Sequence, residues 1–257
     1  MSDAISPQTL EFYSTKLMNC PYLPDRKERK LLTELAVGAD PQLTYDTLAR
    51  YGFRRSHNWA YRTACPECSA CVPVRMVVAE FQPTRSMRRC AQRHATWQAE
   101  PRPPVATDEQ FELFSRYVKG RHGDGEMATM DYGQYRAMLE ETTIDTAVVE
   151  FRHSGRLVAG IIVDRVNDGL SAVYSFYDPD LASAGPGTYM VLWLIEETRR
   201  QSLPNMYLGY WVANCRKMDY KIRFRPLQAL GDSGWRTLDP PDWHPPTAPA
   251  TPPEEPQ

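Results

Sequence analysis

Residues 146–177 read TAVVEFRHSGRLVAGIIVDRVNDGLSAVYSFY, and this stretch decides the fold. It holds three apolar runs rich in β-branched residues, Thr146–Arg152, Leu157–Val166 and Ser171–Tyr177, which have the length and composition of strands. The dipeptides Ser154-Gly155 and Asp168-Gly169 separate the runs, and such pairs favour tight hairpin turns. The sequence therefore predicts three consecutive antiparallel strands.

Helical patterns flank these strands. Thr107 and Gln110 form a capping box that opens a helix ending near Gly120, and a second helix is expected at about 132–141. After the strands come the glycine loop 185–187, an apolar helix at about 188–201 and a strand at 205–211. This order resembles the acetyltransferase-like (GNAT) core, in which the helix start faces the acyl donor and the sheet splays open for the acceptor. The resemblance implies an α+β fold with a mixed sheet.

The first hundred residues are less regular. Helices are expected at 25–37, 41–51 and within the arginine-rich segment 83–97, and extended pieces at 59–62 and 71–78. The proline cluster 101–104 marks a boundary. We therefore expect a Cys/Arg-rich N-terminal region (1–103), a GNAT-like domain (104–238) and a tail (239–257). Eight of the 22 prolines fall in that tail, which is expected to be disordered.

Charge is unevenly distributed. The net charge is −2, yet Arg50–Arg102 holds ten arginines against three glutamates, which is +10 − 3 = +7. Guanidinium groups suit phosphate and carboxylate, so the segment favours an anionic partner over a merely solvated surface. No apolar run reaches the roughly 18 residues that span a bilayer, and the first ten residues lack a basic region before an apolar stretch. We expect a cytoplasmic protein without a membrane partner.

The six cysteines include a compact group, Cys65, Cys68 and Cys71. Each CxxC turn directs two sulfurs to one side, and a zinc ion or iron–sulfur cluster takes a fourth sulfur. Cys20 is the natural fourth ligand and Cys90 the second choice. The alternative is a set of reduced thiols packed as small apolar groups. A structural zinc or iron–sulfur cluster is therefore one interpretation of this group.

Cations and aromatic residues alternate near the end of the folded part. Residues 216–225 carry five cations and one acid, interleaved with Tyr220 and Phe224. Such a mixture suits a single-stranded RNA end, where bases stack and phosphates need neutralising. A second cationic group, Arg54 and Arg55 with Arg75, flanks the cysteines and suits an acidic side chain or an RNA phosphate.

Several separated motifs occur in one order: CPYLPDR at 20–26, GFRRS at 52–56, CxxCxxC at 65–71, Arg121-His122, YSFYDP at 174–179 and YLGYW at 207–211. Over residues of about 10–238 the chain thereby resembles the bacterial aspartate/glutamate leucyltransferases, which are relatives of the eukaryotic arginyl-tRNA–protein transferases. The resemblance implies transfer of leucine from leucyl-tRNA to proteins that begin with Asp or Glu, in the N-degron pathway. It implies no cofactor for the transfer itself.

Roles for individual residues follow as expectations. The end of the third strand should lie where the sheet opens, so we expect Asp178, Tyr174 and Tyr177 to be catalytic, with Asp178 orienting or deprotonating the incoming amine. The alternative for Asp178 is a strand-end turn. The acidic N-terminal residue would be bound by Arg54, Arg55 and Arg75. The tRNA would be bound by Tyr210, Lys217, Tyr220, Lys221, Arg223 and Arg225.

Two other functions remain open at this point. The glycine loop 185–187 at a helix start can bind a pyrophosphate, as in a coenzyme A-dependent acyltransferase, although Pro186 removes one N–H donor. The cysteines and arginines also fit a non-enzymatic RNA-binding or redox-sensing module built around a metal.

Overall fold

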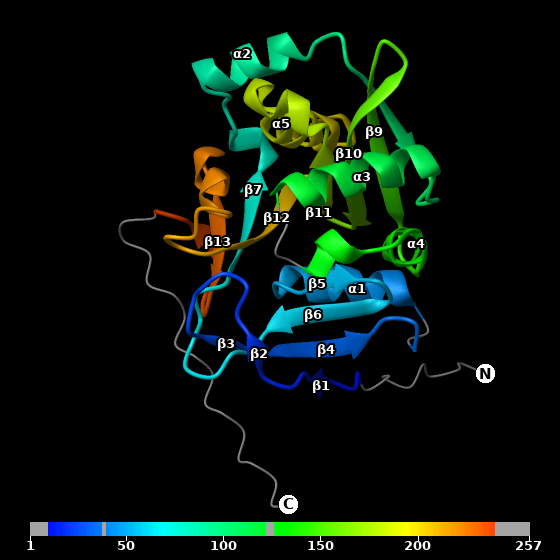
Figure 1. Cartoon of the computed structure of the whole chain (residues 1–257). Coiled ribbons are helices and arrows are strands. Elements are labelled where there is room, and N and C mark those ends of the chain that lie inside the picture. Colours follow the sequence, from blue (N-terminus) through cyan, green and yellow to red (C-terminus); the bar gives the residue numbers. More distant parts are fainter. Residues whose placement is uncertain (1–9, 38–39, 122–125, 240–257) are drawn as a thin grey trace, which may run out of the picture.

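The computed structural model describes residues 10–37, 40–121 and 126–239 (Figure 1). His122 and residues 240–257 of the expected tail lie outside the described residues.

The centre of the molecule is an eight-stranded sheet of order β14-β13-β7-β12-β11-β10-β9-β8. Its strands are β7 (Val72–Val77), β8 (Gln98–Arg102), β9 (Thr146–His153), β10 (Arg156–Val166), β11 (Gly169–Tyr177), β12 (Asn205–Trp211), β13 (Gln228–Gly231) and β14 (Gly234–Thr237). Neighbouring strands are antiparallel except β11 and β12, which run parallel. The mixed sheet and the predicted run of three strands, β9 to β11, are confirmed.

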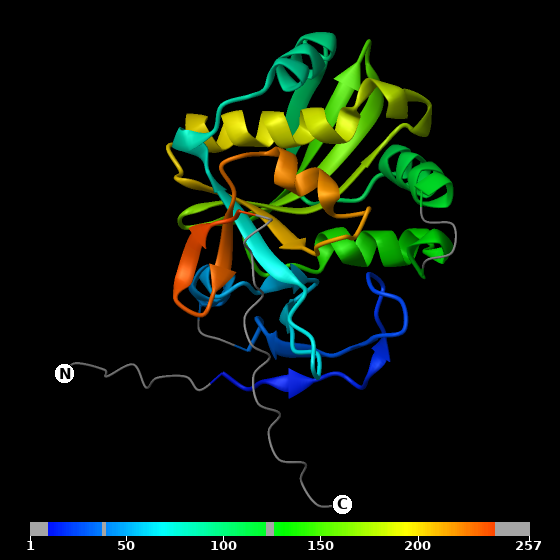
Figure 2. The same ribbon diagram turned by 90° about the vertical axis from the view of Figure 1, so that its left-hand side faces the viewer.

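Helices cover both faces of this sheet (Figure 2). One face packs against α2 (Arg85–Arg93) and α5 (Pro186–Arg200), the other against α3 (Asp108–Arg121) and α4 (Tyr132–Glu140). Alternate residues of β9 serve the two layers, since Val148 faces α3 and α4 whereas Val149 faces α5. The predicted capping box is present, because the Gln110 amide donates to Thr107 Oγ1 at 3.2 Å and the Thr107 amide to Gln110 Oε1 at 3.3 Å.

A smaller unit precedes the large sheet. It contains a four-stranded sheet of order β1-β4-β6-β5, a two-stranded ribbon β2-β3 and the helix α1 (Pro41–Arg50). The strands are β1 (Tyr13–Ser14), β2 (Met18–Asn19), β3 (Lys27–Glu28), β4 (Lys30–Glu34), β5 (Arg54–Ser56) and β6 (Trp59–Thr63). Helix α1 packs Tyr45 and Leu48 into a core shared with Val166 and Tyr207 of the large sheet.

The helix expected at 25–37 is wrong, because this segment forms β3 and β4. Its Leu, Lys and Glu residues favour a helix only weakly, and pairing of β4 with both β1 and β6 overrides that preference.

The large sheet crosses the boundary expected at residues 103 and 104. Strand β7 pairs with β12, and β8 pairs with β9, so both parts of the chain build one sheet. The described residues also form four short 3-10 helices: η1 (Val78–Glu80), η2 (Glu126–Thr129), η3 (Pro179–Ala184) and η4 (Asp219–Arg223). In the described parts, no helix has both the length and the apolar character needed to cross a bilayer.

Candidate functional site

The two parallel strands at the centre of the sheet diverge. Their pairing covers Gly169–Ser171 of β11 and Asn205–Tyr207 of β12, after which β11 continues along β10 and β12 along β7. A register shift lies at this point on each side, between Ile162 and Val163 in β10 and between Tyr207 and Gly209 in β12. Such bulges bend a strand and redirect its side chains. We call the wedge between the diverging strands the splay.

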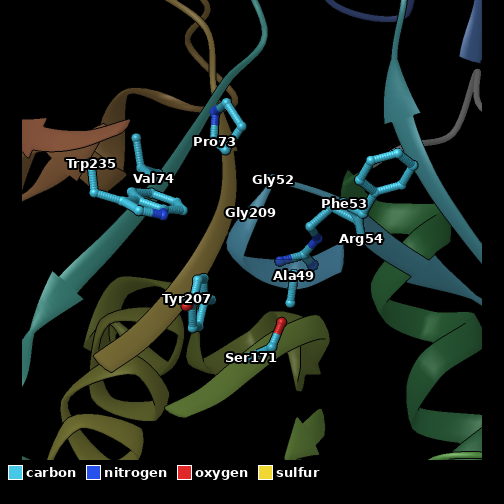
Figure 3. Close-up of a pocket in the computed structure, with 10 residues that line it drawn as sticks. All are labelled: Ala49, Gly52, Phe53, Arg54, Pro73, Val74, Ser171, Tyr207, Gly209 and Trp235. Atoms are coloured by element: carbon cyan, nitrogen blue, oxygen red, sulfur yellow. The ribbon is translucent and has the colours of Figure 1, made fainter. Parts of the chain in front are cut away.

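Arg54, from β5, occupies the closed end of the splay (Figure 3). Its Nη2 donates to the carbonyl oxygens of Ala172 at 2.6 Å and Val173 at 3.4 Å, both on β11. On the other side it abuts β12, where a Cβ at Gly209 would lie 2.7 Å from Arg54 Nη1. Nη1 itself is buried and has no hydrogen-bond partner among the described residues. Because a guanidinium stays charged, the splay contains a fixed cation with an unused donor.

Tyr174 supplies a second unused donor. Its hydroxyl is buried and has no partner in the part of the chain that the structure describes, and its ring packs on Phe114 of α3 with centroids 5.8 Å apart. Burial raises the pKa of Tyr174, and the neighbouring Tyr117 adds to this, so the group is a neutral hydroxyl near pH 7. Tyr177 packs on Tyr117 with ring centroids 4.8 Å apart, and the Tyr177 hydroxyl accepts a hydrogen bond from Arg121 Nη1 at 3.5 Å.

Tyr220 of η4 lies beside the same groups. Partial burial raises the pKa of Tyr220, and the guanidinium groups of Arg54 and Arg121 act in the opposite direction. Hydrogen bonds bring these segments together: Arg121 at the end of α3 donates to the Tyr177 hydroxyl on β11, and Lys221 of η4 donates to the Tyr210 carbonyl on β12. The splay is thus bordered by β11, β12, the end of α3 and the η4 segment.

Asp178 does not fit the expected catalytic role. It is 1% exposed, and its carboxylate pairs with Arg116 at 2.8 Å and with Arg156. It also caps η3 by accepting from the Asp180 amide at 3.2 Å. Because both oxygens are engaged, the alternative of a strand-end turn describes this residue.

Arg55 and Arg75 are likewise occupied inside the protein. Arg55 forms a fully buried two-point pair with Asp164 at 2.9 and 2.8 Å. The guanidinium of Arg75 bonds to Gln228 at 3.0 Å and lies 4.4 Å from the ring centre of Trp235. These contacts do not fit the expected binding of an acceptor carboxylate. Of the three arginines, Arg54 alone has a buried donor without a partner in the described structure.

The expected tRNA contacts separate into two groups. Tyr210 is 6% exposed and donates to the Gly52 carbonyl at 3.0 Å, and Lys221 is 6% exposed and donates to the Tyr210 carbonyl. Burial lowers the pKa of Lys221 to about 7. Neither side chain is placed to meet RNA at the surface. By contrast, Tyr220 is 40% exposed and the remaining basic residues are also exposed: Lys217, Arg223 and Arg225.

The four predicted thiol ligands lie close together. Burial raises the pKa of Cys71 to about 12, and the neighbouring Cys65, Cys20 and Cys68 raise it further. All are free thiols, and Cys20 Sγ accepts from the Leu23 amide at 3.4 Å. Across residues 10–37, 40–121 and 126–239, however, no group of three or more His, Cys, Asp or Glu side chains is arranged to hold a metal ion. The sulfur set suits zinc or iron–sulfur chemistry, but it is not arranged as a coordination shell.

The sequence patterns predict neither the close approach of Arg54 to Gly209 nor the ion pairs of Arg116 and Arg156 with Asp178. The signal for Gly209 was present, because a glycine inside a strand often marks close approach of another group. Arg116 and Arg156 gave no local signal, since they lie 62 and 22 residues from Asp178 in the chain.

Comparison with known proteins gives a consistent result. Residues 18–89 match the family described as "Arginine-tRNA-protein transferase, N terminus", and residues 109–231 match its C-terminal counterpart. The chain is 51% identical over 232 residues to the aspartate/glutamate leucyltransferase of Paramagnetospirillum magneticum, covering 90% of this chain and 95% of that one. It is 49% identical over 228 residues to the leucyltransferase of Granulibacter bethesdensis, covering 88% and 85%.

Solved structures resemble the chain more distantly. L-PGS from Bacillus licheniformis gives a TM-score of 0.46 at 12% identity, covering 56% of this chain and 48% of that one. FemX gives a TM-score of 0.45 at 8% identity, covering 70% and 64%.

Proposed function

The chain belongs to the arginine-tRNA-protein transferase family, and from this premise we propose how its splay performs an aminoacyl transfer. The enzyme is an aminoacyltransferase that moves leucine from leucyl-tRNA to the N-terminus of proteins beginning with Asp or Glu, which commits them to N-degron proteolysis. The ester of the charged tRNA is already activated, so the transfer needs no further cofactor. Family membership favours this donor over coenzyme A and over a non-enzymatic RNA-binding role.

The chemistry is attack of an α-amine on an ester carbonyl. A C–N bond forms, the C–O bond to the terminal ribose breaks, and the amine proton leaves while the ribose hydroxyl is regained. A free α-amine has a pKa of about 8, so part of it is already neutral near pH 7. Positioning of the two substrates can therefore supply much of the rate, together with donors that stabilise the tetrahedral oxyanion.

The observation that carries the proposal is the unpartnered Nη1 of Arg54. A buried donor without a partner costs about 1–3 kcal/mol, more for a charged group, so its presence favours a ligand that completes it. A carboxylate is the best match for a guanidinium. The bonds to Ala172 and Val173 fix the guanidinium in the splay and leave Nη1 for the acidic side chain of the acceptor.

We assign Tyr174 to the reacting centre through its unpartnered hydroxyl, which is a neutral donor suited to a developing oxyanion. Tyr177, held by Arg121 and Tyr117, is assigned a positioning role at the open end of β11.

The four cysteines are a proposed metal set with a structural role. Cys20, Cys65, Cys68 and Cys71 would hold zinc or an iron–sulfur cluster, and metal analysis of anaerobically purified protein tests this. Stoichiometric metal that is lost from a Cys68→Ser variant supports the assignment, and metal-free active protein contradicts it.

The role of Arg54 is tested with Arg54→Ala and Arg54→Lys, with the exposed Arg62→Ala as the charge-matched control. Losing a charge-assisted hydrogen bond of about 1.5–3 kcal/mol should lower kcat/KM for an Asp-starting peptide by roughly 10- to 100-fold. The Kd for leucyl-tRNA should stay near that of the wild type, and Arg54→Lys should recover only part of the loss. An equal loss of tRNA affinity, or no loss with the acidic peptide, would refute the assignment.

A further inference from the structure

Helix α2 presents an unusual row of positive charge. Arg85, Arg88, Arg89 and Arg93 are all exposed, at spacings of three and four residues, and α2 contains no acid. Residues spaced in this way lie along one side of a helix. The opposite side buries Met87 and Cys90 against the core, which fixes the helix on the protein.

These arginines have no acidic partner in the described structure. Arg88 Nη1 donates to the Pro83 carbonyl and Arg93 Nη1 to the Ala184 carbonyl, at 2.6 and 2.9 Å, so backbone oxygens orient them without neutralising them. Some arginines elsewhere in the described structure do pair with carboxylates, as Arg152 does with Glu109 at 2.7 Å and Arg116 with Asp178 at 2.8 Å. The charge on α2 is therefore available to a partner outside the chain.

The η4 segment adds to the same surface. Phe224, directly after η4, packs on Phe81, which lies four residues before α2, with ring centroids 6.3 Å apart, so the exposed Arg223 lies on the side of α2. The pKa of Cys90 on α2 agrees with this, because burial raises it and the guanidinium groups of Arg93 and Arg223 both counteract the rise. Cys90 Sγ donates to the Gly185 carbonyl at 3.4 Å, so Cys90 lies at the start of α5. The arginines beside Cys90 therefore lie there as well. Figure 2 shows α5 lying between α2 and the η4 segment.

We propose that Arg85, Arg88, Arg89, Arg93 and Arg223, the α2 basic surface, bind the phosphate backbone of the tRNA acceptor stem and direct its charged end into the splay. The inference rests on the proposed function, because it takes an aminoacyl-tRNA as the donor. Arginine forks match phosphate oxygens, and phosphate contacts dominate the affinity of proteins for nucleic acid.

Position favours RNA over an acidic protein as the occupant. The η4 segment links the α2 basic surface to the splay, since Phe224 packs on Phe81 just before α2 and Lys221 of η4 donates to the Tyr210 carbonyl on β12. An aminoacyl-tRNA must place both its terminal ester and the preceding duplex on the enzyme, which needs a continuous positive path. An acceptor polypeptide needs only its first residues in the splay.

The test is an Arg88→Ala/Arg89→Ala double variant, with Arg62→Ala/Arg165→Ala as the control that loses the same charge elsewhere. Binding of uncharged tRNA is measured against KCl concentration, and transfer kinetics are measured with leucyl-tRNA and an Asp-starting peptide. Each phosphate contact adds about 0.9 to the magnitude of the slope of log K against log KCl concentration. The slope of the α2 variant, which lacks two arginines, should therefore be smaller in magnitude by nearly 2. Its Kd for tRNA should rise roughly 10-fold or more at moderate salt, with KM for leucyl-tRNA raised and kcat unchanged. The control should match the wild type.

Three outcomes overturn or separate the claims. If tRNA affinity, salt slope and transfer are all unchanged, the α2 basic surface does not bind tRNA, and the proposed function is unaffected. A raised KM for the acidic peptide without a change in tRNA binding overturns tRNA binding by this surface in favour of protein docking. If the wild type transfers nothing from any aminoacyl-tRNA, the proposed function fails, and the binding measurements alone still decide whether α2 binds RNA.

Discussion

The guanidinium of Arg54 packs directly against the backbone of Gly209 at the closed end of the splay. A Cβ at residue 209 would lie 2.7 Å from Arg54 Nη1, and the backbone there has φ of +74°, which disfavours a side chain. We expect Gly209→Ala to displace the guanidinium and to lower kcat/KM for an Asp-starting peptide by at least 10-fold, because about 1.4 kcal/mol already gives that factor. Steady-state kinetics measure this directly.

Gly155→Ala is the control for backbone strain. Its φ is +81°, but nothing lies within 4 Å of the added Cβ. Both variants should lose some free energy of unfolding, about 1 kcal/mol or more from strain. Only Gly209→Ala should lose transfer activity, and an equal kinetic effect of both substitutions would remove Arg54 from the site.

Lys221 makes stability depend on pH. Burial lowers the pKa of Lys221 to about 7, the nearby Arg54 lowers it further, and Cys215 and Cys71 oppose this. An unfolded lysine has a pKa of about 10.4, so between pH 7 and 10 the unfolded chain binds more protons at this site. The free energy of unfolding therefore rises with pH through this group, by up to about 1.4 kcal/mol per pH unit.

The substitution Lys221→Met isolates that contribution. Urea unfolding at pH 7, 8 and 9 should show the difference between wild type and variant moving in favour of the wild type as pH rises. Titration of the groups that do not interact with Lys221 is common to both proteins and cancels in the difference. A difference that stays constant with pH would mean that Lys221 keeps an ordinary pKa.

At the scale of elements, local sequence was a good guide where a pattern was strong. The capping box at Thr107, the turn at Ser154-Gly155 and the apolar helix α5 each carry their signal within a few residues, and all are confirmed. Residues 25–37 were predicted wrongly because their fate depends on pairing of β4 with β6, about 30 residues further along the chain.

The same distinction applies to the site. The motifs located the segments that meet at the splay, since Arg54, Tyr174 and Gly209 all come from stretches that the sequence singled out. The motifs do not show which charged side chains form ion pairs inside the fold. Arg55 is paired with Asp164, 109 residues away, and Asp178 with Arg116, 62 residues away. Such partners become neighbours only when the sheet and helices assemble.

At the scale of the whole molecule, the fold brings Arg54, which we propose to bind the acceptor, and the proposed RNA-binding surface to one splay. Helix α3 and β11 supply the tyrosines, β5 supplies Arg54, and the η4 segment extends from the splay toward α2. Because these parts come from both halves of the chain, the complete site requires the sheet that joins them. This arrangement allows both substrates to bind together, as direct transfer requires.

The most direct test mixes the purified chain with labelled leucyl-tRNA and four otherwise identical peptides that begin with Asp, Glu, Asn or Gln. We expect leucyl-peptides from the Asp and Glu peptides, and far less product from their uncharged counterparts or when arginyl-tRNA is the donor. Equal transfer to all four peptides, or none to the acidic pair, would contradict this expectation.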